Sequence, residues 1–260
     1  MSDYRGRFLW SELLTNDPAK ATAFYTTVVG WGTEAWPGMD APYQVWRRGE
    51  VPIGGLMELP AEAKAAGAPS HWLAYIGTPD VDQTVASAEK AGGKVWVAPR
   101  DIPSVGRFAV LADPGGVMFA VYKPEADPGP DEAPTLGDCS WREIVAGDPD
   151  QSWKFFSGLF GWEKKGAAHD MGPMGPYQEY GRPGDARALG GLYKKPADMP
   201  GPPHLMLYFR VADVSKAAEV VKTHGGQVLH GPAEVPGGDF ILTCLDPQGA
   251  AFSLHHTSKG

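Results

Sequence analysis

Cysteine is scarce in this sequence, since only Cys139 and Cys244 occur among 260 residues. Two cysteines are too few for a disulfide framework or for a zinc site built mainly from thiolates. They are typical of reduced thiols, so we expect a cytoplasmic protein. Basic residues are also in the minority, because 23 lysines and arginines stand against 31 acidic residues. The net charge of −8 argues against nucleic acid as a partner, since binding to phosphates needs a basic patch.

Long apolar runs are missing as well. No stretch approaches the roughly 18 apolar residues that cross a bilayer, so we expect no membrane partner. The segment from Met1 to Arg7 leads into a strand-like stretch and lacks the apolar region of a signal peptide. Glycine and proline are abundant instead, with 34 and 25 residues. They follow no collagen-like period and therefore indicate many turns between short elements.

The second half of the chain repeats the first. Motifs recur in the same order in the two halves: Asp17-Pro18 and Asp148-Pro149, Pro42-Tyr43-Gln44 and Pro176-Tyr177-Gln178, Gly54-Gly55-Leu56 and Gly190-Gly191-Leu192, Asp113-Pro114 and Asp246-Pro247. So many ordered matches indicate a tandem duplication. Residues 124–136, rich in proline and acids, predict a stiff, solvated linker. We therefore expect a first domain at 1–123, the linker at 124–136 and a second domain at 137–260.

Each repeat divides again into two modules. Alternating apolar residues over 8–14 predict a strand, and Asn16 or Asp17 caps a helix that has Pro18 in its first turn. Three short strands follow. The same order then recurs around a helix that Asp80 caps. The predicted fold is α+β, with four βαβββ modules forming two tandem domains.

These features resemble the vicinal oxygen chelate superfamily, which includes glyoxalase I, bleomycin-resistance proteins and extradiol dioxygenases. The resemblance is carried by the Asp-Pro, Phe-Tyr and Gly-Trp motifs around the first helix and by the closing Asp-Pro-x-Gly hairpins. It extends from about residue 8 to residue 256. More narrowly, the chain resembles two-domain glyoxalase/bleomycin-resistance-like proteins of antibiotic-producing bacteria, some of which are called hydroxylases. The resemblance implies the fold, but the site must decide the function.

Metal-binding members of the superfamily place His, Gln or Glu ligands on inward strands. The aligned positions of this sequence hold other residues: Trp10, Leu73 and Ala120 in the first repeat, and Trp141, Met206 and Ser253 in the second. None of these side chains offers the imidazole or carboxylate that a divalent cation requires. We therefore expect neither a metal nor another cofactor at the usual positions.

Residues two apart on a strand share a face, so the neighbours of these positions predict the lining of a cavity. The predicted ligand-binding residues are Trp10, Trp46, His71, Tyr75, Tyr122, Trp141, Tyr180, His204, Tyr208 and His255. Glu12 and Glu143 are the candidate catalytic acids or bases, because a buried carboxylate must be paired, hydrated or raised in pKa.

Several alternatives stay open. Trp10 and Trp141 could simply fill the space that the ligands have left, and His71 and His204 could be structural. The two glutamates could instead bond to backbone or to an arginine at the mouth of the cavity. A relocated metal site could form from Glu143, His204 and His255.

Two classes of function follow. The first is a metal-free protein that binds an apolar or aromatic small molecule, such as an antibiotic or a metabolite, for sequestration or assisted conversion. The second is an enzyme of lyase, hydroxylase or dioxygenase type that uses Glu12 or Glu143, or the relocated metal. The second repeat can supply the partner that single-domain relatives obtain from another chain. A monomer is therefore expected, with a dimer as the alternative.

Overall fold

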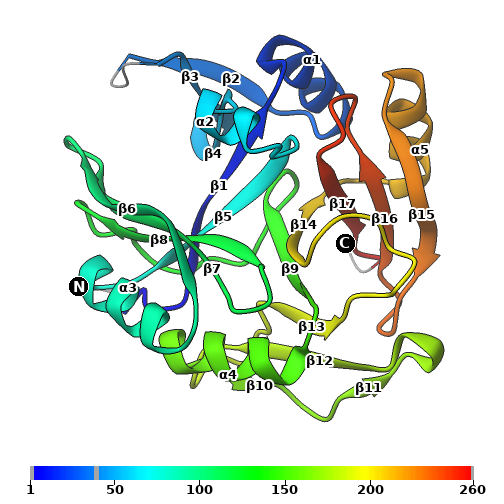
Figure 1. Cartoon of the computed structure of the whole chain (residues 1–260). Helices are drawn as coiled ribbons and strands as arrows, with labels where there is room; N and C mark the ends of the chain where they lie inside the picture. Colours follow the sequence, from blue (N-terminus) through cyan, green and yellow to red (C-terminus); the bar gives the residue numbers. More distant parts are fainter. Residues whose placement is uncertain (1–2, 38–40, 259–260) are drawn as a thin grey trace. The chain divides into compact units, whose positions relative to one another are not determined.

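Each repeat folds into two βαβββ modules, as the sequence predicts (Figure 1). The computed structural model describes residues 3–37 and 41–258, so the outermost ends of the expected domains lie outside the described residues. The first repeat comprises β1 (Phe8–Thr15), α1 (Pro18–Val28), β2 (Gly32–Trp36), β3 (Tyr43–Arg48), β4 (Val51–Glu58), α2 (Ala61–Ala65), β5 (His71–Gly77), α3 (Val81–Lys90), β6 (Lys94–Ile102), β7 (Gly106–Ala112) and β8 (Met118–Pro124).

The second repeat follows the same plan, with short additions before its third strand. It comprises β9 (Cys139–Ala146), α4 (Pro149–Phe160), β10 (Glu163–Lys164), β11 (His169–Asp170), η1 (Gly172–Met174), β12 (Pro176–Gly181), β13 (Gly190–Lys194), β14 (His204–Arg210), α5 (Val214–Thr223), β15 (Gln227–Glu234), β16 (Phe240–Leu245) and β17 (Ala251–His256). The strand orders are β2-β3-β4-β1-β5-β8-β7-β6 and β10-β12-β13-β9-β14-β17-β16-β15, and β11 pairs with β12. The predicted α+β class is confirmed.

The four long module helices begin where the sequence predicts. The Asp17 side chain accepts a hydrogen bond from the backbone N–H of Lys20 at 3.0 Å, with Pro18 as the first helical residue of α1. Asp80, Asp148 and Asp213 cap α3, α4 and α5 in the same way. Each cap satisfies an N–H that the helix itself leaves unpaired. None of the helices within residues 3–37 and 41–258 is both long and apolar enough to cross a bilayer.

Compact packing groups the modules across the repeats. The α3–α4 unit comprises Met1–Leu9, Ala74–Glu132 and Trp141–Leu205, and the α1–α5 unit comprises Trp10–Leu73, Ala133–Ser140 and Met206–Gly260. Each unit thus joins one module of the first repeat to one module of the second. The domain limits expected from the sequence stay a prediction.

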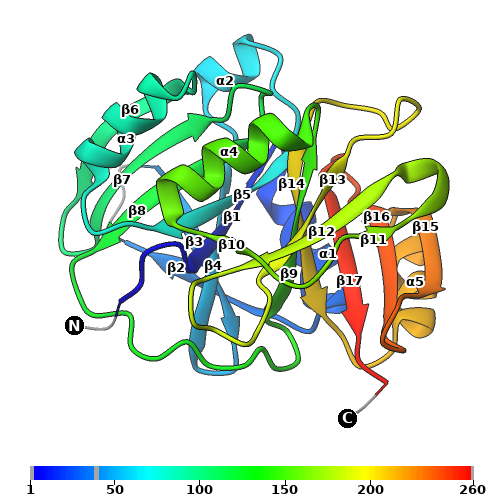
Figure 2. The same ribbon diagram turned by 90° about the horizontal axis from the view of Figure 1, so that it is seen from below.

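Aromatic rings form the core of the α3–α4 unit. Phe119 of β8 packs against Phe156 of α4 with 5.0 Å between ring centroids, and both residues are fully buried. Asp113, in the turn that follows β7, accepts a hydrogen bond from Ser152 in the first turn of α4. The closing hairpin of the first repeat is therefore bonded to the first helix of the second, and α3 lies beside α4 (Figure 2).

The α1–α5 unit repeats this arrangement with a different polar centre. Tyr25 of α1 is fully buried, and its hydroxyl accepts a hydrogen bond from Trp72 Nε1 at 2.9 Å. The same hydroxyl donates to Asp246, in the closing hairpin of the second repeat, at 3.3 Å. Burial raises the pKa of the Asp246 carboxyl above its ordinary value. A neutral phenol thus bridges an indole and a buried acid in this core.

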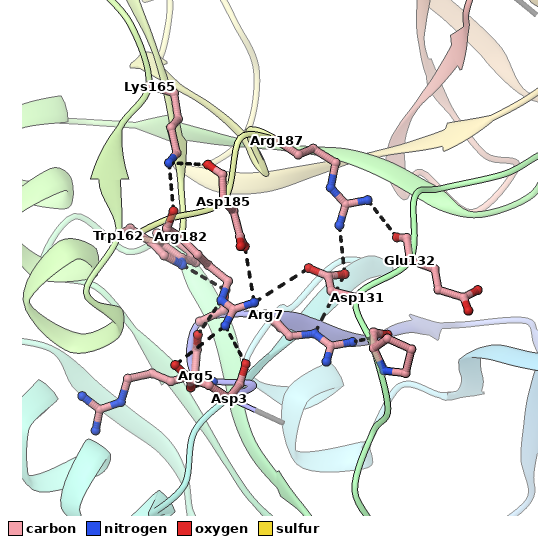
Figure 3. Close-up of polar contacts among 12 residues, drawn as sticks. Asp3, Arg5, Arg7, Asp131, Glu132, Trp162, Lys165, Arg182, Asp185 and Arg187 are labelled. Atoms are coloured by element: carbon pink, nitrogen blue, oxygen red, sulfur yellow. Dashed lines mark hydrogen bonds and ion pairs between the residues drawn. The ribbon is translucent and has the colours of Figure 1, made fainter. Parts of the chain in front are cut away.

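Most residues of 124–136 are exposed, and part of this segment is also anchored within the α3–α4 unit. Figure 3 shows Arg7, Arg182 and Arg187 around Asp131. Arg7 donates to the carbonyls of Gly129 at 2.7 Å and Pro130 at 3.1 Å, and Arg187 lies 2.9 Å from the Asp131 carboxylate. The side chain of Arg7 is 9 % exposed, so it binds the linker from a largely buried position.

Replacing Arg7 by leucine should release the linker. The variant loses two hydrogen bonds from a charged donor and leaves two linker carbonyls without these partners, which we expect to cost about 2–4 kcal/mol. Proteolysis and amide exchange of residues 127–133 should both accelerate. Arg5→Leu is the control, because Arg5 bonds through its backbone: its N–H donates to Asp3 and its carbonyl accepts from Arg182. Equal protection of the linker in the two variants would contradict this account.

Candidate functional site

Three side chains in the second repeat form a directed hydrogen-bond chain, which we name the Trp141–Tyr177–Glu143 cluster. Trp141 and Glu143 stand on β9, and Tyr177 stands on β12. Trp141 Nε1 donates to the Tyr177 hydroxyl at 2.8 Å, and this hydroxyl donates to Glu143 Oε1 at 2.8 Å. An indole N–H can only donate, so the phenol proton points toward the carboxylate. All three residues belong to the α3–α4 unit.

Tyr193 of β13 completes the surroundings of this cluster. Its ring stacks on that of Tyr177 with 5.8 Å between centroids, and its side chain is almost fully buried. Burial first, and then the charge of Glu143, raise the pKa of both tyrosines. Both phenols therefore stay protonated at neutral pH, and Tyr177 acts as a hydrogen-bond donor to the carboxylate.

A glycine pair on β13 makes room for the cluster. Gly191 lies beside Glu143 in the strand register, and a Cβ at Gly191 would stand 2.0 Å from the Tyr177 hydroxyl. A Cβ at Gly190 would lie 1.7 Å from the carbonyl oxygen of Arg142, which belongs to the backbone. Real Cβ atoms do not come so close to other atoms, so position 190 requires glycine, whereas a Cβ at position 191 would displace the Tyr177 side chain.

The first repeat keeps the same arrangement, in the α1–α5 unit. Trp10 Nε1 donates to the Tyr43 hydroxyl at 3.1 Å, and Glu12 is 6 % exposed. Gly55 lies beside Glu12 in the register, and a Cβ at Gly55 would stand 1.8 Å from the Tyr43 hydroxyl. The Trp, Tyr, Glu and Gly residues therefore recur as one set in both repeats.

Sequence reasoning missed Tyr43, Tyr177 and Tyr193. A signal for the first two was present, because the Pro-Tyr-Gln and Gly-Gly-Leu motifs recur together in both repeats. A small residue facing a large one across neighbouring strands is a typical sign of close approach. Tyr193 had no such signal, since Met57 stands at the matching position.

The structure places Trp46 and Tyr180, two of the predicted ligand-binding residues, within the aromatic cores. Both side chains are fully buried. Trp46 packs against Tyr25 and Trp31, and Tyr180 stacks on Trp162 with 4.6 Å between centroids. These rings are parts of the two aromatic cores, and ligand binding by them remains a prediction.

The cavity beside Trp46 holds about 10 Å³, which is room for one water molecule. It is lined by Ser11, Trp31, Trp46, Ile53, Gly54, Trp72, Gly137, Cys139 and Phe209, all in the α1–α5 unit. Pockets for drug-sized ligands are typically about 300–1,000 Å³. An aromatic ligand therefore does not fit into this core.

His71 and His204 occupy matching positions at the starts of β5 and β14. The Nδ1 atom of His71 lies 2.8 Å from the carbonyl oxygen of Pro69, and that of His204 lies 2.9 Å from the carbonyl oxygen of Pro202. Each ring can satisfy this contact by donating from Nδ1, which leaves Nε2 unprotonated in the neutral form. Burial lowers the pKa of both rings. A structural role explains these contacts.

These two histidines predict a loss of stability in acid. Because the folded-state pKa lies below the unfolded value near 6.5, the unfolded chain binds more protons as the pH falls. Stability should therefore decline as the pH drops from about 6.5 through the folded-state pKa values. The double variant His71→Asn/His204→Asn keeps an N–H donor and should flatten this decline. Urea unfolding at pH 5 and pH 8 measures the effect, and equal slopes for both proteins would refute it.

The other predicted ligand-binding residues do not belong to the Trp141–Tyr177–Glu143 cluster. Tyr122 donates its hydroxyl to the Val105 carbonyl at 2.9 Å, and its ring lies 6.2 Å from that of Tyr75. Tyr208 is buried. His255 lies 2.8 Å from Ser140 and 3.0 Å from Asp239. Ligand binding by these residues remains a prediction.

Comparison with known proteins identifies the family. The model of the Glyoxalase/Bleomycin resistance protein/Dioxygenase superfamily matches residues 7–121 and 139–254. The chain belongs to this superfamily. The anthracycline biosynthesis protein DnrV of Streptomyces peucetius is 29 % identical over 261 residues, which cover 99 % of this chain and 88 % of that protein.

A second relative is closer in sequence but matches over a shorter stretch. The putative glyoxylase CFP32 of Mycobacterium tuberculosis is 47 % identical over 122 residues, which are 46 % of this chain and 44 % of that protein. The match thus spans less than half of the length of this relative.

Solved structures of the superfamily share the fold. The Mn(II)-bound glyoxalase of Novosphingobium aromaticivorans superposes with a TM-score of 0.64 at 19 % identity, over 98 % of this chain and 83 % of that chain. A homoprotocatechuate 2,3-dioxygenase variant from B. fuscum gives a TM-score of 0.67 at 17 % identity, over 98 % and 74 % of the two chains.

The side chains at the aligned ligand positions do not fit a divalent cation. Leu73, Ala120 and Met206 are buried and apolar, and the Ser253 hydroxyl is paired with Thr243 at 3.0 Å. Within residues 3–37 and 41–258, no group of three or more His, Cys, Asp and Glu side chains is placed to hold a metal. The relocated site considered for Glu143, His204 and His255 is therefore not formed.

Proposed function

We propose that this member of the superfamily binds a planar aromatic small molecule with a hydroxyl group, and that a divalent cation does not take part. The observation that carries the proposal is the Trp141–Tyr177–Glu143 cluster, with its counterpart around Glu12. Metal-binding relatives have a metal ligand at the position of Trp141. Here the Trp141 indole donates to Tyr177, which in turn donates to the Glu143 carboxylate.

The chemistry of the carboxylate supports this ligand class. An ionised carboxylate accepts about four hydrogen bonds, and Tyr177 supplies one to Glu143. A ligand phenol could supply another, while its rings pack on Trp141 at about 0.5–1.5 kcal/mol per ring pair beyond burial. The similarity to a protein named for anthracycline biosynthesis, over nearly the whole chain, favours a polycyclic aromatic ligand.

A matched pair of ligands tests the proposal. Quenching of tryptophan fluorescence should report binding of a dihydroxyanthraquinone, and its dimethoxy analogue should bind about tenfold or more weakly, because methylation removes the donor. Glu143→Gln should weaken binding of the dihydroxy compound by a similar factor and leave the dimethoxy compound unchanged. Equal affinities of the two compounds for the wild type would refute the role of the carboxylate.

The hydrogen bond between Tyr177 and Glu143 favours a second candidate, an enzyme in which Glu143 is a general base. A carboxylate that is held in place by a phenol can take a proton from a bound hydroxyl. Mass spectrometry of the bound compound distinguishes the two candidates. Conversion that is lost in Glu143→Gln supports the enzyme, whereas an unchanged ligand supports a binding protein.

We further propose a cytoplasmic monomer. Cys139 and Cys244 form no disulfide, which supports a reducing compartment. Burial raises the pKa of the Cys244 thiol to about 12, so this thiol is unreactive. Sedimentation tests the oligomeric state, and a dimer mass would refute the monomer.

A further inference from the structure

A second series of hydrogen-bonded polar groups lies in the α1–α5 unit, and none of its members belongs to the Trp141–Tyr177–Glu143 cluster. Ser140 Oγ is 2.8 Å from His255 Nδ1, and His255 Nε2 is 3.0 Å from Asp239 Oδ2. Ser140 stands on β9, His255 on β17, and Asp239 immediately before β16. A hydroxyl, an imidazole and a carboxylate thus follow one another within hydrogen-bond distance.

The acceptor groups determine which atoms of this hydrogen-bonded series carry a proton. The ionised Asp239 carboxylate can only accept, so it selects the imidazole tautomer with a proton on Nε2. Nδ1 of the neutral ring then has a lone pair directed at Ser140, whose hydroxyl can donate to it. The Tyr208 carbonyl, at 3.3 Å from Ser140 Oγ, is a longer alternative acceptor. The shorter of the two Ser140 contacts is therefore the one to His255, whose Nδ1 can act as a base.

The duplication provides an internal comparison. The first repeat has Leu9, Tyr122 and Gly106 at the three matching positions, and it forms the same strands. The fold therefore does not require the serine, the histidine or the aspartate.

Ser140, His255 and Asp239 are also more exposed than the buried polar pairs of the core. Ser140, His255 and Asp239 are all half-buried, with 16 % of the His255 side chain and 33 % of the Asp239 side chain exposed. In contrast, Ser253 of β17, which is hydrogen-bonded to Thr243 of β16, is fully buried. The three residues keep part of their surface exposed, whereas Ser253 has none.

We propose that Ser140, His255 and Asp239 form a nucleophilic site that hydrolyses small carboxylic esters. Ser140 Oγ attacks the ester carbonyl carbon while His255 Nδ1 takes the hydroxyl proton. The bond to the alcohol oxygen breaks, and the alcohol leaves with that proton. Water then attacks the acyl-serine, gives a proton to Nδ1, and releases the carboxylic acid as the proton returns to Ser140. Asp239 is a positioning residue that fixes the tautomer of His255.

Covalent labelling of the full chain tests this site. A fluorophosphonate probe should label the wild type at Ser140, mapped by peptide mass spectrometry, and the protein should hydrolyse p-nitrophenyl acetate. Ser140→Ala should abolish the label, and His255→Ala should slow labelling about 100-fold or more, with partial rescue by added imidazole. Ser87→Ala, an exposed serine on α3, is the matched control and should label like the wild type.

A spectroscopic signature separates the role of Asp239 from a structural one. In ¹⁵N spectra of the histidine rings, the signal lost in His255→Ala should show the Nε2–H tautomer. In Asp239→Asn, the same ring should shift toward the Nδ1–H tautomer, because the charged acceptor is gone. Labelling at another serine, no labelling of the wild type, or an unchanged tautomer would overturn the proposal. Binding of the dihydroxyanthraquinone should be unaffected by Ser140→Ala, so the two proposals fail independently.

Discussion

Replacing Gly190 by alanine should prevent folding, whereas the same change at Gly191 should leave the fold intact. At Gly190 the new methyl group would lie 1.7 Å from the carbonyl oxygen of Arg142, and backbone on a neighbouring strand cannot move away without breaking the pairing of β13 with β9. We expect a loss of more than about 4 kcal/mol, which is a large part of the stability of a typical domain.

At Gly191 the methyl group meets a movable side chain instead. Its position is 2.0 Å from the Tyr177 hydroxyl, so the ring must swing away and the hydrogen bond to Glu143 is lost. The variant should fold with a loss of about 1–3 kcal/mol and bind the dihydroxyanthraquinone about tenfold more weakly. Circular dichroism and the fluorescence titration measure the two effects. A Gly190→Ala protein that folds normally would refute the geometry.

Replacing Tyr25 by phenylalanine should cost about 2–4 kcal/mol, although a single oxygen atom is removed. The change leaves the indole N–H of Trp72 without its partner and removes a donor from Asp246, and all three side chains are buried. The midpoint of thermal unfolding should fall by about 5–10 °C. Tyr122→Phe is the control, because its half-buried hydroxyl donates one hydrogen bond to a carbonyl, and its loss should cost about 1 kcal/mol.

The effect of Tyr25→Phe should also depend on pH. Burial raises the pKa of Asp246, so ionisation of this carboxyl reduces stability as the pH rises through the folded-state pKa. The hydrogen bond from Tyr25 lowers that pKa, and its loss raises the pKa further. The variant should therefore be closer to the wild type at pH 4, where a larger fraction of the carboxyl is protonated, than at pH 7. A destabilisation that is the same at both pH values would contradict the role of the Asp246 charge.

The sequence predicted the modules well because their signals are local. Asp17, Asp80, Asp148 and Asp213 each cap a helix through contacts within three residues, so the helix starts are visible in the sequence itself. The duplication was equally visible, since repeated motifs need no knowledge of the fold. The helix α2 was missed, although Ala61–Ala65 consists of strong helix formers.

The candidate site was harder to predict because it depends on contacts across strands. Strand alternation predicts that Trp46 faces inward, and it is buried, but alternation alone does not separate a packed core from the wall of a cavity. The pairing of β3 with β4 also shifts register next to this residue. Tyr180 also faces inward, and only its contact with Trp162 shows that it belongs to the core. The grouping of modules across the repeats had no local signal, because it depends on which helices pack together.

Calorimetric titration in the presence of a chelator tests the central claim most directly. The full chain is titrated with the dihydroxyanthraquinone without treatment, after treatment with EDTA, and after Mn(II) is then added in excess of the EDTA. If the Trp141–Tyr177–Glu143 cluster binds the ligand, affinity should be the same in all three conditions and about tenfold lower in Glu143→Gln. Binding that disappears with EDTA and returns with Mn(II) would contradict the account, because it would require a metal that these residues cannot hold.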